Sequence, residues 1–152
     1  MDEDKLNRLP PDVKKQFLKL ALKLSEKKTK SKVHDDFLSF VKHVWPEFIE
    51  GKHHKEIADK FNRLAKGEIK RLIINMPPRH TKSEFASYLL PSWMVGRRPN
   101  LKIIQTTHTT ELAIRFGRKA KTLMDSEEYK QVFSTRIRED SQAAGNWTSE
   151  EL

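Results

Sequence analysis

A lysine and a serine stand side by side at the end of a short loop, where both could contact a phosphate. They are Lys82 and Ser83, and the segment 76–81 that leads to them is a proline-rich, basic loop. A short apolar run, 71–75, precedes the loop, and a segment of helical length follows it. Because the N–H groups at the start of a helix lack partners within the helix and attract anions, this junction is suited to phosphate binding.

Lys82 and Ser83 match the lysine and serine that end a Walker A loop. There the lysine reaches the β- and γ-phosphates of a nucleotide, and the serine hydroxyl takes a place in the shell of Mg²⁺. The usual pattern, G-x-x-x-x-G-K-[ST], is not met, because Met76 and Thr81 occupy the two glycine positions. The alternative is a loop stiffened by Pro77 and Pro78, in which Thr81 caps a helix and Lys82 is solvated.

The elements around the loop predict an α/β fold. The runs 71–75 and 101–107 have the consecutive branched apolar residues of strands buried in a parallel sheet. Helices are predicted over 84–95 and after Thr109 or Thr110, either of which can cap the second one. Strand, helix, strand and helix in this order predict a right-handed crossover and a parallel sheet.

Other segments show helical spacing without strands between them. Apolar residues recur at three- and four-residue steps over 11–28, 35–45, 53–66 and 127–133. Gly67 is placed to end the third of these helices in a left-handed cap. The lysine-rich stretch 26–32 is interpreted as a linker, with a solvated helix end as the alternative. The expected domains are therefore 1–32, a helix with a basic linker, and 33–152.

The charge of the chain indicates a polyanionic partner. Its 152 residues hold 30 Lys plus Arg against 21 Asp plus Glu, a formal net charge of +9. Without cysteine it can form no disulfide and no thiolate zinc site. The longest apolar stretch, 85–96, is about 12 residues, where a membrane span needs roughly 20. Residues that could contact DNA phosphates, or form ordinary solvated surface, are Lys27, Lys28, Lys30, Lys32, Arg97, Arg98, Arg115, Arg118, Lys119 and Lys121.

The loop and its flanks together resemble viral terminase large subunits, the ATPases that pump DNA into phage proheads. The resemblance extends from about Phe37 to Thr148. It rests on the deviant Walker A loop 72–84, the preceding segment 48–59, the following helix and strand within 91–108, and the ending 140–148. It implies a P-loop NTPase fold of the RecA/ASCE type, with a truncated parallel sheet preceded by N-terminal helices.

The resemblance also implies roles for single residues. ATP and Mg²⁺ would be the cofactors, with Lys82 on the phosphates and Ser83 on Mg²⁺. Arg79 would act in cis on the γ-phosphate, where a planar guanidinium can stabilise the charge that develops; a salt bridge to a carboxylate is the alternative. The adenine contact falls to His54, although His53 stands beside it and either could lie at the surface. The predicted nucleotide-binding residues are Pro78, Arg79, His80, Thr81, Lys82, Ser83 and His54, of which Arg79 and Lys82 are catalytic.

By the same resemblance the chain is the ATP-binding part of a DNA-packaging motor. Its expected partners are double-stranded DNA, the portal, the small terminase subunit and further copies of itself, in the host cytoplasm and transiently at the prohead portal, with no membrane. The Walker B strand and nuclease domain would lie beyond Leu152, so the chain alone is expected to lack ATPase activity. An open sheet edge would make it poorly stable or prone to associate. The alternatives are a non-catalytic basic module that holds DNA or a motor partner, and another P-loop translocase or helicase.

Overall fold

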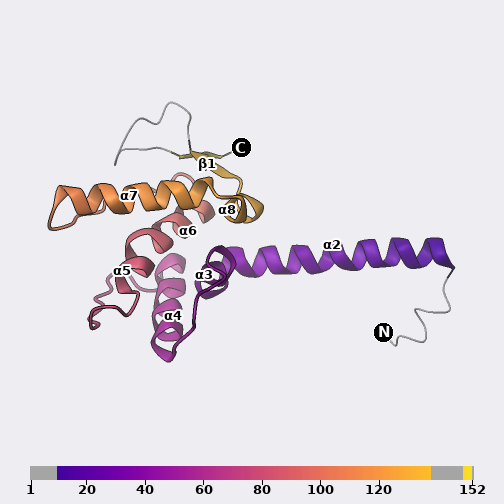
Figure 1. The fold of residues 1–152 in the computed structure, drawn as a ribbon, viewed down its shortest axis with the longest axis horizontal. Coiled ribbons are helices and arrows are strands. Elements are labelled where there is room, and N and C mark those ends of the chain that lie inside the picture. The colour runs from indigo at the N-terminus through magenta and orange to yellow at the C-terminus, as the bar shows by residue number, and fades with distance from the viewer. Residues whose placement is uncertain (1–9, 138–148, 152) are drawn as a thin grey trace.

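Helices make up most of the protein, as a computed structural model shows for residues 10–137 and, at the level of the backbone, 149–151. A long helix, α2, projects from a group of shorter helices (Figure 1). The elements are α2 (Pro11–Asp35), α3 (Phe37–Val44), α4 (Lys52–Lys66), α5 (Lys82–Glu84), the π-helix η1 (Phe85–Leu89), α6 (Leu90–Arg97), α7 (Thr110–Asp125), α8 (Glu127–Val132) and β1 (Thr135–Ile137), which pairs antiparallel with β2 (Ser149–Glu151).

The predicted parallel sheet, and with it the α/β P-loop NTPase fold class, is wrong for the described part of the chain. The segments 71–75 and 101–107, expected to be buried strands, have no regular secondary structure and pair with no strand there. Ile73 is 86% exposed and Ile104 is 90% exposed. A strand is held by hydrogen bonds and side-chain pairs to its neighbours, so apolar composition alone does not form one.

Helix α2 continues through 26–32, where a linker was expected. Lysine and glutamate are good helix formers. The basic residues Lys32 and His34 lie in the last turn, where basic side chains interact favourably with the negative end of the helix dipole. The predicted domain boundary after residue 32 falls inside this helix. The apolar residues of its outer half, Val13, Phe17, Leu18, Leu20, Leu22 and Leu24, are exposed.

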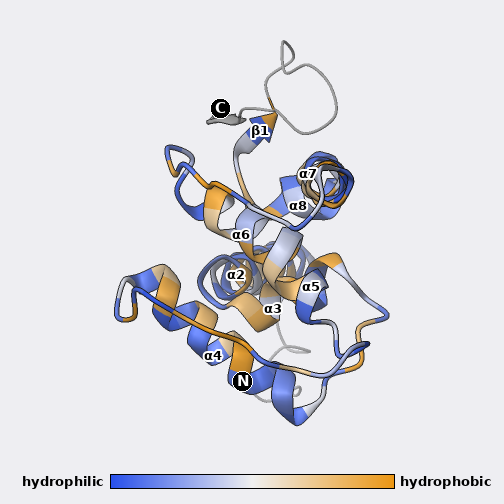
Figure 2. Ribbon diagram, turned by 90° about the vertical axis from the view of Figure 1, so that its left-hand side faces the viewer, coloured by the Kyte–Doolittle hydropathy of each residue, from blue (hydrophilic) through white to orange (hydrophobic). Residues whose placement is uncertain are grey.

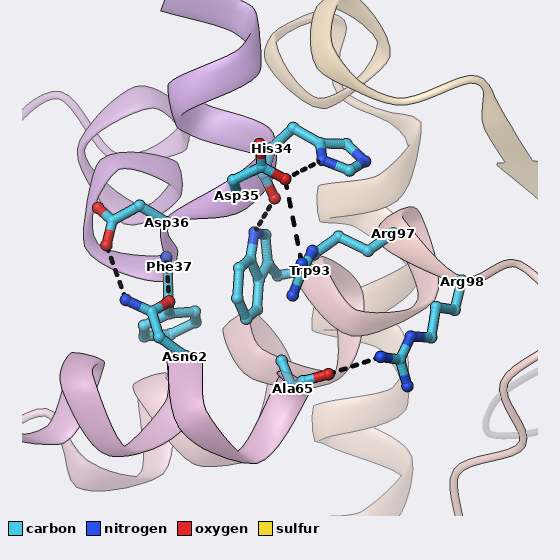
Figure 3. Close-up of polar contacts among 9 residues, drawn as sticks. All are labelled: His34, Asp35, Asp36, Phe37, Asn62, Ala65, Trp93, Arg97 and Arg98. Atoms are coloured by element: carbon cyan, nitrogen blue, oxygen red, sulfur yellow. Dashed lines mark hydrogen bonds and ion pairs between the residues drawn. The ribbon is translucent and has the colours of Figure 1, made fainter. Parts of the chain in front are cut away.

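One non-helical residue, Asp36, separates α2 from α3. Its carboxylate caps α3 by accepting a hydrogen bond from the N–H of Ser39 at 2.8 Å. The side-chain amide of Asn62, on α4, donates to the same carboxylate and accepts from the N–H of Phe37, each at 2.8 Å (Figure 3). Burial would raise the pKa of Asp36, but the hydrogen bonds from Ser39 and Asn62 outweigh it and lower the pKa. These contacts fix α4 against the junction of α2 and α3.

The core is aromatic and centres on Phe37, which is fully buried. The ring packs edge-on against Phe61 at 5.0 Å, Phe85 at 5.4 Å and Trp93 at 5.5 Å between centroids. The indole N–H of Trp93 donates to the carbonyl of His34 at 3.1 Å (Figure 3). Phe37 thus joins α3 to α4, η1 and α6.

Helices α5, η1 and α6 form one continuous helical run over 82–97. This run is longer at both ends than the helix expected over 84–95. Pro91 has no N–H to donate to the carbonyl of Ser87, so it disrupts the regular α-helical pattern. The five-residue π-helix ends at Leu89, two residues before Pro91. The regular α-helical pattern is therefore interrupted just before Pro91.

Local capping signals were read correctly at two helix ends. Gly67 ends α4 with φ 82°, a left-handed conformation that glycine adopts readily. The hydroxyl of Thr109 caps α7 by accepting from the N–H of Leu112 at 3.3 Å. The buried residues of these two helices are hydrophobic except for His54: they are Ile57, Ala58, Phe61 and Ala65 on α4 and Phe116, Ala120 and Met124 on α7. Figure 2 shows hydrophobic residues interspersed with hydrophilic ones along both helices.

Candidate functional site

The loop that ends at Ser83 contains two residues in the left-handed backbone region. Arg79 has φ 65° and Thr81 has φ 55°. Residues other than glycine are uncommon there, and a β-branched residue such as threonine is an outlier. Thr81 occupies the second glycine position of the usual pattern, directly before Lys82. The backbone thus has the conformation that favours glycine, although the residue is threonine.

Lys82 begins the helical run, and its side chain folds back over the loop. Its Nζ donates a hydrogen bond to the carbonyl oxygen of Met76 at 3.4 Å. The N–H of Phe85 donates to the carbonyl of Thr81 at 2.9 Å, so the N–H groups of 82–84 come before the first intrahelical bond. Ser83 is exposed in the same turn. An ammonium, a hydroxyl and several backbone donors are therefore grouped at one end of a helix.

Arg79, His80 and Pro78 form the outer turn of the loop, and all three are exposed. The Nδ1–H of His80 donates to the carbonyl of Pro78 at 2.8 Å. Arg79 makes no ion pair with any residue that the structure describes, so the salt bridge weighed as its alternative role is not seen there. Its guanidinium is accessible to a bound anion.

His54 lies against the loop from the first turn of α4 and is 5% exposed. Its Nδ1 accepts a hydrogen bond from the N–H of Gly51 at 2.8 Å, and its Nε2 lies 2.6 Å from the hydroxyl oxygen of Thr81. Burial lowers the pKa of His54, and the neighbouring His53 lowers it further. The structure thus brings His54 to the predicted site, with both ring nitrogens engaged; its adenine contact stays a prediction.

Two further imidazoles lie beside His54. The ring centroid of His53 is 3.8 Å from that of His54 and 5.6 Å from that of His80. The Nε2 of His53 is buried without a hydrogen-bond partner among the described residues. The sequence analysis placed His53 beside His54 but did not bring His80 to them.

Two contacts at the site had no signal in the sequence. His54 and Thr81 are 27 residues apart, and the carboxylate of Glu84 accepts from Lys119, 35 residues away, at 2.9 Å. The Glu84 pair ties α7 to the turn that follows Ser83. Neither pair has a fixed spacing that a motif could record, because each depends on how the helices pack.

The basic residues proposed for DNA have different surroundings. The guanidinium of Arg97 lies 4.6 Å from the ring centre of Trp93 and 4.0 Å from the carboxylate of Asp35. Arg98 donates to the carbonyl of Ala65 at 2.8 Å (Figure 3). Both arginines therefore support the packing of α6 against α2 and α4.

Arg115 and Arg118 remain available on α7. They line an open groove whose apolar part is formed by Val44, Tyr88, Ile114 and Leu123. Within residues 10–137 neither arginine forms an ion pair, whereas Lys119 beside them is paired with Glu84. This groove is a second surface that could meet phosphates.

The donor set at Ser83 fits a metal ion held mainly by a nucleotide. Mg²⁺ keeps several waters and is bound through one or two protein oxygens together with substrate phosphates. The described residues contain no group of three or more His, Asp or Glu side chains that could hold a metal ion alone. A single exposed hydroxyl, that of Ser83, is suited to a Mg²⁺ ion whose other ligands are waters and nucleotide phosphates.

Comparison of the chain with known protein families, curated proteins and solved structures found no match. No helix in the described part of the chain is long and apolar enough to cross a membrane. The terminal segment 140–148, which contributed to the resemblance, lies outside the described residues.

Proposed function

We propose that the protein binds Mg-ATP at the loop 76–83 as the nucleotide-binding part of a viral DNA-packaging motor of the terminase type. The observation that carries this proposal is the position of Lys82. It follows a left-handed residue, begins a helical run and folds its ammonium over the carbonyl of Met76. A phosphate chain in the loop would offer that ammonium a stronger, charged acceptor than a carbonyl oxygen.

Each residue of the loop would have a defined task. Lys82 would bind the phosphates as a cation, and the N–H groups of 82–84, which precede the first intrahelical bond, would donate to their oxygens. Ser83 would contribute its hydroxyl to Mg²⁺, which neutralises phosphate charge when bound. Arg79, exposed and without an ion pair among the described residues, would approach the γ-phosphate bidentately. Double-stranded DNA, the portal, the small terminase subunit and further copies of the chain belong to this proposal as partners in the host cytoplasm and at the prohead.

Titration with a fluorescent ATP analogue in the presence of Mg²⁺ tests the proposal. We expect saturable binding that Lys82→Ala weakens at least tenfold, because the ammonium is the cation at the start of the helix. Lys66→Ala, at the far end of α4, is the matched control and leaves binding unchanged. Absence of binding by the unaltered protein at millimolar nucleotide would overturn the proposal.

A second candidate function, binding of DNA without nucleotide chemistry, is supported by the two arginines of the α7 groove. Combined substitution Arg115→Ala and Arg118→Ala should then lower affinity for a DNA duplex and reduce the salt dependence of binding. Lys82→Ala would have little effect on DNA in that case. Loss of ATP binding with unchanged DNA binding, or the reverse, separates the two functions.

A further inference from the structure

Thr81 needs an explanation, because its side chain and its backbone conformation disagree. With φ 55° and ψ 9° it is left-handed, the region in which a Cβ is crowded by its own backbone. Such a conformation persists only where surrounding contacts hold it. Thr81 directly precedes Lys82, so its conformation sets the direction in which the lysine leaves the loop.

A chain of hydrogen bonds reaches Thr81 from α4. The N–H of Gly51 can only donate, so Nδ1 of His54 accepts from it and Nε2 carries the ring proton. That proton is donated to the hydroxyl oxygen of Thr81 at 2.6 Å. The hydroxyl in turn donates to the carbonyl of His80 at 2.7 Å. Every polar atom of the two side chains is thus used, and each bond has a defined direction.

The imidazole that holds Thr81 is itself fixed by packing. The ring of His54 lies 4.8 Å from that of Phe48 and 5.1 Å from that of Phe85, between centroids. Both rings belong to the partly or fully buried aromatic core. His54 therefore connects the aromatic core to the residue before Lys82.

We propose that His54 and the hydroxyl of Thr81 together replace the glycine that a phosphate-binding loop ordinarily carries before its lysine. Glycine reaches the left-handed conformation without steric penalty. Here a threonine is held in it from the side, by a hydrogen bond to a buried histidine. His54 is thus a positioning residue for Lys82. This inference rests on the proposed nucleotide-binding function of the loop.

Substitution of Thr81 by glycine supplies the decisive test, since glycine needs no hydrogen bond to stay left-handed. His54→Leu removes both hydrogen bonds of the ring but keeps an apolar side chain between Phe48 and Phe85. With Thr81 present we expect His54→Leu to weaken binding of the Mg-bound fluorescent ATP analogue about tenfold, as loss of a buried hydrogen bond would. With Thr81→Gly we expect the same change at His54 to have no effect. His53→Leu is the matched control.

Hydrogen exchange of the backbone gives a readout that does not depend on ATP. His54→Leu should speed amide exchange over 79–85 in the presence of Thr81 and leave it unchanged in the Thr81→Gly background. Equal acceleration in both backgrounds would overturn the inference, since His54 would then act through packing. If the loop shows the expected exchange pattern but ATP does not bind, the proposed function fails and the hydrogen-bonded support of Thr81 stands.

Competition with tripolyphosphate separates positioning from an adenine contact. A positioning role predicts that His54→Leu weakens tripolyphosphate and ATP by the same factor. An adenine contact predicts a loss for ATP alone, and that result would overturn the inference.

Discussion

The ammonium of Lys119 lies 2.9 Å from the carboxylate of Glu84 and joins α7 to the turn after Ser83. The two side chains are about one third exposed. We expect Glu84→Gln to lower the free energy of unfolding by up to about 1 kcal/mol, as for ion pairs near the surface. Urea unfolding with a double-mutant cycle that includes Lys119→Met measures the pair. The coupling should shrink in 1 M salt; a coupling that salt leaves unchanged would contradict this assignment.

Phe37 should be the most sensitive apolar position of the core. Its ring is fully buried and meets three other aromatic rings, so Phe37→Ala leaves a cavity that the helices cannot fill. We expect a loss of about 3–5 kcal/mol in the free energy of unfolding. Leu22→Ala, at a position 64% exposed on α2, should change it by less than about 0.5 kcal/mol. Both values come from urea unfolding followed by circular dichroism.

Acid should destabilise the fold through His54. Its pKa is lowered in the folded protein by burial and by the nearby His53, while Glu50 acts to raise it and His80 to lower it. The unfolded chain therefore takes up the proton first. The contribution of His54 is complete above about pH 6.5 and is lost as the pH falls below it. Protonation of Nδ1 also removes the acceptor for the N–H of Gly51.

Urea unfolding between pH 8 and pH 5 measures this effect. Glu50 contributes little in this range, because its ordinary pKa of 4.5 and its pKa in the folded protein, lowered to about 2 by hydrogen bonds from Lys42 and Lys55, both lie below pH 5. His54→Gln should flatten the pH dependence, and His53→Gln should largely retain it. An unchanged pH dependence in His54→Gln would show that another group is responsible.

The exposed isoleucines of the two irregular segments should promote association. Ile73 and Ile104 present large apolar side chains to solvent on backbone without strand partners in the described structure. We expect a concentration-dependent increase in sedimentation coefficient that Ile73→Lys with Ile104→Lys reduces. Leu18→Lys on α2 is the matched apolar control. If only the control suppresses association, α2 is the contact surface.

The helices could be predicted from the sequence because their signals are local. Gly67 and Thr109 mark helix ends by their own conformational preferences and short hydrogen bonds, and both expectations are confirmed. The strands predicted over 71–75 and 101–107 are wrong, because a strand depends on partners elsewhere in the chain that a local apolar pattern does not record. The linker over 26–32 was wrong because a lysine-rich stretch is both soluble and a good helix former.

The role of the site stays a prediction, while the positions of its residues can be compared with the sequence. Lys82 and Ser83 are the first two residues of the helical run 82–97, close to the helix start that the sequence indicated. The left-handed Thr81 was visible only as a departure from the glycine pattern, and its contact with His54 depends on the packing of α4 beside the loop. A sequence motif records which residues are adjacent in the chain. It does not record hydrogen bonds from residues that are distant in sequence, such as the one from His54 to Thr81.

The single residue between α2 and α3 decides the direction in which the long helix leaves the body. With 25 residues, α2 is about 37 Å long. A rotation of about 10° at Asp36 would therefore move its far end by about 6 Å. Asn62 holds Asp36 and Phe37 together at this junction. A spectroscopic label near Val13 would therefore report small rotations at the junction as large displacements.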